Sequence, residues 1–191
     1  MPALLVPSVD LRPSFLAAMA EFRGEGRGRC DDVSTVGHEL RTNAWGDDGA
    51  GFAAYVARLR ADVLDEAPRP AGYVPCTTLW WADGDQYLGR VAIRHRLNDW
   101  LRDVGGHIGY DVRPSCRRQG HGAAMLAAAL PVAADLGIDP ALITCDVTNV
   151  ASRKLIERAG GELEDDRCGK LRFWVSTRPG RHAVRASAMS E

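Results

Sequence analysis

The sequence has no long apolar run and no clear excess of charge of either sign. No stretch approaches the roughly 20 apolar residues that a membrane-spanning helix needs. The N-terminal segment MPALLVPSVD also lacks the basic start and long apolar core of a signal peptide. The 191 residues include 25 acidic and 24 basic ones. We therefore expect neither a membrane partner nor a nucleic-acid partner, because nucleic-acid binders normally carry a strongly basic face.

Cysteine is sparse and forms no metal-binding or disulfide pattern. The five cysteines are odd in number and widely separated: Cys30, Cys76, Cys116, Cys145 and Cys168. No C-x-x-C pair occurs, so we expect no metal site and a cytoplasmic protein with reduced thiols. With 46% hydrophobic and 26% charged residues, the composition is that of an ordinary globular chain, which excludes the disordered and fibrous classes.

The length suits one domain, which we expect over residues 1–177, with a flexible polar tail over 178–191. Apolar residues at three- to four-residue spacing predict a helix over 10–22, capped by Asp10 or Ser14, and a second helix after Gly51. The Gly- and Arg-rich segment GEGRGRCDD between them predicts an exposed loop.

From Thr77 the apolar period shortens and predicts strands. TTLWWAD and QYLGRVAIRHRL, separated by Gly84-Asp85, are typical of a hairpin. Further strands are predicted over 105–114, 141–147 and 171–175, and helices over 122–136 and 150–159. This order predicts an α/β (α+β) fold with a sheet flanked by helices.

The segment RRQGHG, Arg117 to Gly122, lies between a predicted strand and a predicted helix. Glycines there let backbone N–H groups approach a ligand, and a helix N-terminus attracts phosphate. The alternative, a glycine turn with solvated arginines, stays open on spacing alone. Other nucleotide motifs fail: no Lys-Ser/Thr pair follows as in a P-loop, and Met125 stands where a dinucleotide fingerprint needs its third glycine.

This segment resembles the R/Q-x-x-G-x-G/A signature of the GNAT acetyltransferase superfamily. Val112-Arg-Pro114 before it, and the Asn149-led stretch ending in Gly160-Gly161, resemble the flanking strand and last helix of that family. The resemblance covers about residues 77–175 and implies the GNAT fold, with a central mixed, mostly antiparallel twisted sheet and acetyl-CoA as co-substrate. It implies that acetyl-CoA is bound by Tyr110, Asp111, Val112, Arg117, Arg118, Gln119, Gly120, His121, Gly122, Ala123, Asn149 and Ser152.

The resemblance also marks a departure. Many members carry a tyrosine seven residues after the asparagine, as proton donor to the CoA thiolate, and here that position is Ile156. Ser152 lies four residues earlier on the same helix face. It is a candidate acid, although serines near a helix start commonly serve as structural hydrogen-bonders.

Acetyl transfer to an amine needs a route for the amine proton. His107 is our candidate base because imidazole titrates near neutral pH, with Asp111 as the next candidate. Asp146 could hold an ammonium group, as could acids between Glu39 and Glu66, which outnumber the arginines there six to three. One of the four tryptophans Trp80, Trp81, Trp100 and Trp174 could stack on a sugar or cationic ligand, and we select Trp80 and Trp174 as the candidates. Each of these residues could instead be a packed or solvated one.

The overall sequence resembles a GNAT branch that includes kasugamycin 2'-N-acetyltransferases. This resemblance implies a primary amine of an aminoglycoside-type antibiotic as acceptor, and hence antibiotic resistance. Two alternatives are a GNAT enzyme acting on a small metabolite amine or a protein N-terminus, and a non-catalytic acyl-CoA-binding module. We expect a small-molecule partner and allow for a homodimer.

Overall fold

The computed structural model describes residues 1–32, 34–43, 45 and 49–178. The strands are β1 (Ala3–Leu5), β2 (Cys76–Asp83), β3 (Gln86–Arg94), β4 (Ile108–Val112), β5 (Ala141–Asp146), β6 (Glu162–Arg167) and β7 (Lys170–Val175). The helices are α1 (Arg12–Gly24), α2 (Thr35–Thr42), α3 (Ala50–Ala61), α4 (His121–Asp135) and α5 (Val150–Arg158). Short helical turns occupy Val9–Leu11, Leu101–Gly105 and Pro114–Cys116.

The strands of the described residues form one sheet in the order β1-β2-β3-β4-β5-β7-β6. Neighbouring strands run antiparallel, except β4 and β5, which run parallel. This confirms the predicted mixed, mostly antiparallel sheet and the hairpin around Gly84. The β4–β5 pair is in register only at Ile108 and Ile143. After this pair the two strands diverge and leave an opening between them. The candidate site lies in that opening.

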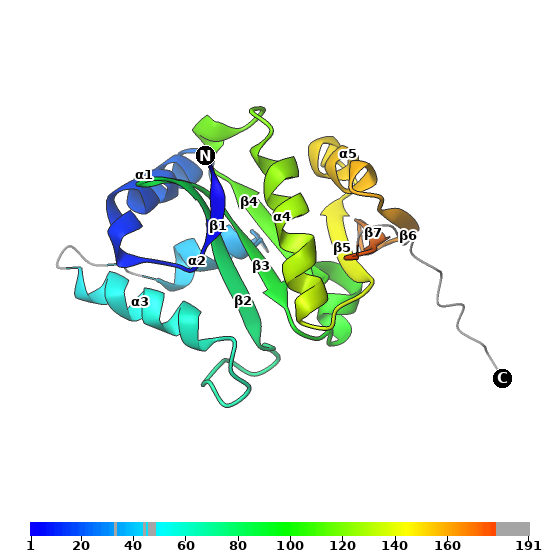
Figure 1. Ribbon diagram of the computed structural model, residues 1–191, viewed down its shortest axis with the longest axis horizontal. Coiled ribbons are helices and arrows are strands. Elements are labelled where there is room, and N and C mark those ends of the chain that lie inside the picture. Colours follow the sequence, from blue (N-terminus) through cyan, green and yellow to red (C-terminus); the bar gives the residue numbers. More distant parts are fainter. Residues whose placement is uncertain (33, 44, 46–48, 179–191) are drawn as a thin grey trace.

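Two clusters of buried side chains, one on each face, hold the helices to the sheet. Because successive residues of a strand point to opposite faces, Trp80 joins the cluster of α1 and α3, while Trp81 joins that of α4 and α5. Trp80 is fully buried and stacks on Phe15 with 5.0 Å between ring centroids. Figure 1 shows α1 to α3 gathered beside β1 and β2, with α4 and α5 on the side of the later strands. The opening between β4 and β5 is therefore reached from helices of both groups.

The start of the first helix differs from the prediction. Neither Asp10 nor Ser14 caps it. Instead the Ser8 hydroxyl accepts a hydrogen bond from the Asp10 amide and caps the Val9–Leu11 turn, from which α1 continues. The Ser14 hydroxyl accepts from the Tyr87 amide and so ties α1 to β3.

The boundaries of other elements also differ from the prediction. The strand predicted over 105–114 begins only at Ile108, because Gly106 has a positive φ of 64° that interrupts extended backbone. The sequence analysis did not predict β1, α2 or β6. The predicted tail falls, from residue 179 on, outside the described residues. No helix in the described part of the chain is long and apolar enough to cross a membrane.

Candidate active site

The site begins with backbone groups of β4 that β5 leaves free. In an antiparallel ladder, alternate residues exchange hydrogen bonds with the partner strand. Arg113 donates to the Leu88 carbonyl at one end of the β3–β4 ladder, and the His107 carbonyl accepts from Arg94 at the other. The odd-numbered residues therefore face β3. The N–H and C=O groups of Tyr110 and the N–H of Val112 consequently face the opening.

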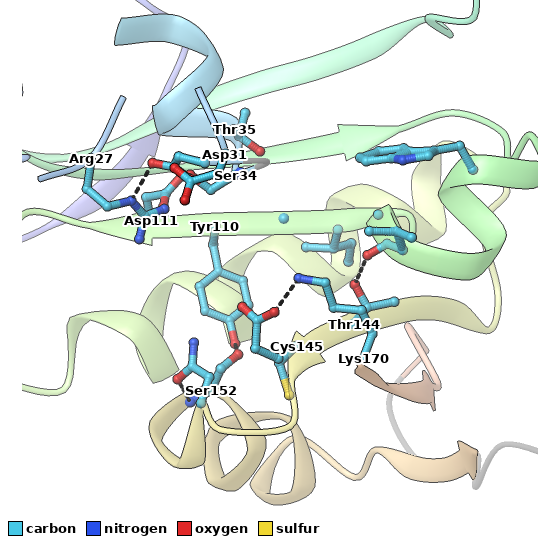
Figure 2. Close-up of a pocket in the computed structure, with 18 of the residues that line it drawn as sticks. Arg27, Asp31, Ser34, Thr35, Tyr110, Asp111, Thr144, Cys145, Ser152 and Lys170 are labelled. Carbon is cyan, nitrogen blue, oxygen red and sulfur yellow. Dashed lines mark hydrogen bonds and ion pairs between the residues drawn. The ribbon is translucent and has the colours of Figure 1, made fainter. Parts of the chain in front are cut away.

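A cavity of about 450 Å³ occupies this opening. It is lined by β4, β5, the start of α5 and the loop between α1 and α2. Figure 2 shows Arg27, Asp31 and Asp111 on one side of β4, and Tyr110 and Ser152 on the other. We call these the Asp111 side and the Tyr110 side of the cavity. One strand thus presents a carboxylate to one side and a phenol to the other.

On the Tyr110 side two hydroxyl groups meet. Tyr110 Oη and Ser152 Oγ lie 2.7 Å apart, and either atom could be the donor. Asn149 caps α5 through its side-chain oxygen, which accepts from the Ser152 amide at 3.0 Å, so the serine is fixed at the start of the helix. Burial raises the pKa of Tyr110 to about 12, against the hydrogen bond to Ser152, which lowers it. Both hydroxyls are therefore protonated at neutral pH.

Position 156 contributes nothing to this side. Ile156 is fully buried in the core beneath α5 and does not line the cavity. Thr144 does line it, but its hydroxyl donates to the Val104 carbonyl at 2.6 Å. Burial raises the pKa of the neighbouring Cys145 thiol, so it stays protonated. On this side of the cavity, the hydroxyl groups of Tyr110 and Ser152 therefore remain available to a ligand, whereas that of Thr144 is bound to backbone.

On the Asp111 side the central group is the Asp111 carboxylate. Its side chain is 15% exposed, and its nearest cations are Arg90 Nε and Arg27 Nη2, each at 3.9 Å. Among the described residues, no donor lies within hydrogen-bond distance of this carboxylate. Burial raises the pKa of Asp111, while the two guanidinium groups act in the opposite direction. The carboxylate is therefore poised to accept a donor from a bound ligand.

The loop between α1 and α2 is built around Asp32. Its carboxylate accepts hydrogen bonds from the Arg27 side chain, the Gly28 amide and both the amide and hydroxyl of Ser34. Burial alone would raise the pKa of Asp32, but these bonds hold it at about 2. The segment predicted as an exposed loop is mostly exposed, as expected, and it also forms one wall of the cavity.

Of the acids predicted to attract a cationic acceptor, Asp146 lines the cavity, whereas Asp47 and Asp48 lie outside the described residues. The described acids between Glu39 and Glu66 do not line it. Glu39 is buried and pairs with Arg90 at 3.3 Å, while Asp62 and Asp65 pair with arginines outside the cavity. The acids that line the cavity are Asp31, Asp32, Asp111 and Asp146. Of these, Asp146 already binds Lys170 Nζ at 2.6 Å.

The loop before α4 has the geometry of an anion cradle. Gly120 has a positive φ of 85°, and a Cβ added there would meet nothing within 4 Å. The first α4 hydrogen bond runs from Ala124 to the Gly120 carbonyl, which leaves the amides of His121, Gly122 and Ala123 without helical partners. These donors and the open space fit a pyrophosphate.

The side chains of this loop are largely held by the protein. Arg117 forms a bidentate pair with Glu25, with both N–O distances 2.8 Å. Gln119 donates to the Ser115 carbonyl, and His121 Nδ1 accepts from Trp81 Nε1. Arg118 stands at a positive φ of 61°. Arg117 is thus engaged with Glu25, while the backbone amides at the start of α4 have no helical partners.

The structure does not bring His107 to the cavity. Its Nδ1 accepts a hydrogen bond from the Leu142 amide at 2.9 Å, and its ring packs near Trp174. Burial lowers the pKa of His107 to about 4. The ring is thus neutral at pH 7, with its acceptor nitrogen bound to backbone.

The tryptophans predicted to contact the acceptor also lie elsewhere. Trp80 is in the core and Trp174 is on β7 beside His107, and neither lines the cavity. Trp100, which the sequence analysis did not select as a site residue, does line it and is 51% exposed. Arg27, Asp31, Thr35 and Lys170 were likewise missed, because nothing in their local sequence marks them.

The chain matches the model of the Acetyltransferase (GNAT) family over residues 39–161, more than half of its length. A search of curated proteins gave no match. Among solved structures, the PaiA N-acetyltransferase of Thermoplasma acidophilum, in complex with coenzyme A, is similar with a TM-score of 0.59. The two chains are 10% identical, and the match covers 92% of this chain and 99% of that one.

Two further structures share the fold. RimJ of Mycobacterium smegmatis, in complex with CoA-disulfide, has a TM-score of 0.62 at 14% identity, covering 92% of this chain and 81% of that one. The microcin C7 self-immunity acetyltransferase MccE, with acetyl-CoA and AMP, has a TM-score of 0.58 at 14% identity and covers 92% of each chain. The family match, the split between β4 and β5 and the cradle before α4 lead to one conclusion. The chain belongs to the GNAT family of acetyltransferases and is an N-acetyltransferase that uses acetyl-CoA.

Proposed function

We propose that this protein acetylates a primary amine of an aminoglycoside-type antibiotic, with the 2'-amine of kasugamycin as the candidate acceptor. The observation that carries the proposal is the Asp111 carboxylate, which faces the cavity with no hydrogen-bond donor of its own among the described residues. The side chain is 15% exposed, so a ligand that displaces solvent from it must supply a donor in its place. An ammonium group supplies it.

The surroundings of Asp111 suit a small polycationic sugar. Asp31 lines the same side, is well exposed, and offers a further carboxylate to an ammonium group of the ligand. The half-exposed indole of Trp100 offers a flat face to a sugar ring or to a cation. Arg27 and Arg29 stand beside the acids and would suit a carboxylate on the same ligand.

In this proposal the residues divide the reaction between the two sides of the cavity. Asp111 holds the ammonium group and takes the proton that the amine loses. The outward-facing amides of Tyr110 and Val112 are placed to donate to oxygen atoms in the opening. The amides at the start of α4 hold the pyrophosphate, and Ser152 offers a hydroxyl proton. Bound acetyl-CoA supplies the acetyl thioester.

The state of the cysteines and one structural neighbour also support the proposal. All five cysteines are free thiols, which suits the cytoplasm, where we place the reaction. A neighbour of similar fold, MccE, is a self-immunity acetyltransferase for the antibiotic microcin C7. Another neighbour is a ribosomal L7/L12 alpha-N-protein acetyltransferase, so a protein N-terminus is the second candidate acceptor.

Thiol release from acetyl-CoA, measured with a panel of amines, tests the proposal. The panel holds kasugamycin, other aminoglycosides, small metabolite amines and peptides with free N-termini. We expect turnover with kasugamycin at a kcat/KM well above that of the other amines. Turnover only with peptides or metabolites would reject the antibiotic acceptor and keep the acetyltransferase. Coenzyme A binding without turnover on any amine would indicate a binding module.

A further inference from the structure

The Tyr110–Ser152 contact joins two elements far apart in sequence. Tyr110 comes from β4 and Ser152 from the first turn of α5, and both line the cavity. Ser152 is held from below by the Asn149 cap. Tyr110 is held by its place in the β3–β4 ladder, opposite Val91. Because both backbone positions are fixed, the contact between the two hydroxyl groups is a stable feature of the fold.

The chemistry of the two groups sets the direction of the hydrogen bond. A phenol is a stronger acid than an aliphatic alcohol, so the favoured arrangement has Tyr110 donating and Ser152 accepting. Among the described residues, Tyr110 Oη has no hydrogen-bond partner other than Ser152 Oγ. The Ser152 hydroxyl also interacts with the neighbouring Cys145 thiol, so its proton can be directed to that sulfur or to an acceptor in the cavity. A phenol behind an alcohol forms a short proton chain that ends at the opening.

We infer that Tyr110 and Ser152 form a proton relay in which Ser152 protonates the departing thiolate of coenzyme A and Tyr110 restores the serine proton. This role uses a hydroxyl from β4 in a chain whose last helix has the buried Ile156 in place of a tyrosine. It rests on the acetyl transfer proposed above and not on which amine accepts the acetyl group.

The ammonium group held by Asp111 first releases one proton to solvent, which leaves a neutral amine. As the C–N bond forms, the nitrogen gives a second proton to the Asp111 carboxylate. As the C–S bond breaks, its electron pair stays on sulfur, and sulfur takes the Ser152 proton while Ser152 takes that of Tyr110. Asp111 then returns one proton to the Tyr110 phenolate through solvent. The products are the amide and the coenzyme A thiol, with the protein unchanged.

Coenzyme A itself provides a readout that needs no acceptor. A hydroxyl that donates to a thiolate stabilises its charged form and lowers the pKa of the thiol. The pKa of the bound thiol can be followed by the ultraviolet absorbance of the thiolate in the wild type and in Tyr110→Phe. Tyr73→Phe is the matched control, because Tyr73 is 52% exposed and bonds to His38 outside the cavity.

We expect Tyr110→Phe to raise the pKa of the bound thiol and to lower kcat by roughly tenfold to a hundredfold, within or below the usual range for a general acid. The KM for acetyl-CoA should change little, because the phenyl ring stays in place. Tyr73→Phe should match the wild type in both measurements. A thiol pKa and kcat unchanged in Tyr110→Phe would overturn the relay.

Ser152→Ala provides a second route to the same answer should Tyr110→Phe fold poorly. It removes the group nearest the opening from a helix that tolerates alanine well. We expect it to raise the thiol pKa at least as much, and the double variant to add nothing further. Independent, additive effects would reject the relay. A wild type that acetylates only amines other than kasugamycin, yet shows these thiol shifts, would reject the antibiotic acceptor and keep the relay.

Discussion

Tyr110 and Asp111 are consecutive residues of β4 whose side chains enter opposite sides of one cavity. The alternation of a strand produces this directly. Asp111 belongs to an ionic chain with Arg90 and Arg27, whereas Tyr110 belongs to a neutral pair with Ser152. The two groups therefore keep different protonation states at neutral pH. A base and an acid can be supplied by adjacent residues without neutralising each other.

Asp111→Asn should lower kcat with the preferred amine by about 10²–10⁴, the usual effect of losing a general base. Because burial raises the pKa of Asp111, the acidic limb of the wild-type kcat/KM profile should lie above the ordinary aspartate range and be lost in the variant. Asp31→Asn is the control. Asp31 is well exposed, so its loss should raise the KM for the amine in a salt-dependent way and spare kcat. Equal kcat in Asp111→Asn and wild type would exclude Asp111 as base.

His107→Asn should keep near-native kcat, because an amide oxygen can replace Nδ1 as acceptor for the Leu142 amide. His107→Ala should destabilise the fold by about 1–3 kcal/mol, the cost of leaving that amide unpaired. Urea unfolding and steady-state kinetics on both variants separate the two effects. A large kcat loss in a stable His107→Asn enzyme would restore His107 as the base.

The same histidine predicts a pH dependence of stability. Its pKa of about 4 in the folded protein lies below the ordinary 6.5, so between these values the unfolded chain binds a proton that the folded protein excludes. The stabilisation from neutral His107 is complete above pH 6.5 and is lost as the pH falls toward 4. Unfolding free energies at about pH 5 and about pH 8 should differ less in His107→Asn than in wild type.

Gly120→Val should abolish tight coenzyme A binding, because its Cβ enters the open space before α4. Gly137→Val is the matched control at the other end of the helix: φ is 78° there and 85° at Gly120, and both positions are open. Both variants should lose about 1–3 kcal/mol from the left-handed backbone. Only Gly120→Val should lose affinity, by at least roughly tenfold, or about 1.4 kcal/mol, in calorimetric titration. Equal affinities in the two variants would remove the cradle from the cofactor site.

The Arg117–Glu25 pair allows two opposite outcomes to be told apart. If Arg117 contacts phosphate, Arg117→Ala should weaken coenzyme A binding and Glu25→Gln should strengthen it by releasing the guanidinium. If Arg117 only ties the loop to α1, both changes should weaken binding alike. Both variants should fold, since an exposed pair contributes less than about 1 kcal/mol. Titrations at low and high salt distinguish the cases.

Sequence reasoning reached the parts of the fold that have a strong period. The hairpin of β2 and β3, the alanine-rich α4 and the helix α5 after Asn149 were predicted and are confirmed. The missed elements lack such a period. β6 is the charged run ELEDDR, which pairs as an edge strand only because β7 offers it a partner. α2 has eight residues with a glycine inside, and its Ser34 cap follows a loop ordered by Asp32.

The site was predictable where function follows from local backbone and not where it follows from tertiary contact. The turn before α4 and the strand of Tyr110 could be found from their neighbours in sequence. The bond between Tyr110 and Ser152 spans 42 positions, and Glu39 and Arg90 meet from segments still further apart in the sequence. His107 was expected on the same strand face as Asp111. It turns away because it precedes the regular strand and bonds to β5 instead.

Only one residue pair joins β4 to β5, so the sheet consists of two parts, β1 to β4 and β5 to β7, that are linked by this pair. A ligand seated in that opening binds the folded protein and not the unfolded chain, so it adds stability by mass action, about 2.7 kcal/mol at a hundredfold excess over its Kd. Marginal proteins gain cellular lifetime from such increments. We therefore expect the unfolding free energy of this protein to rise with the logarithm of the acetyl-CoA concentration above its Kd.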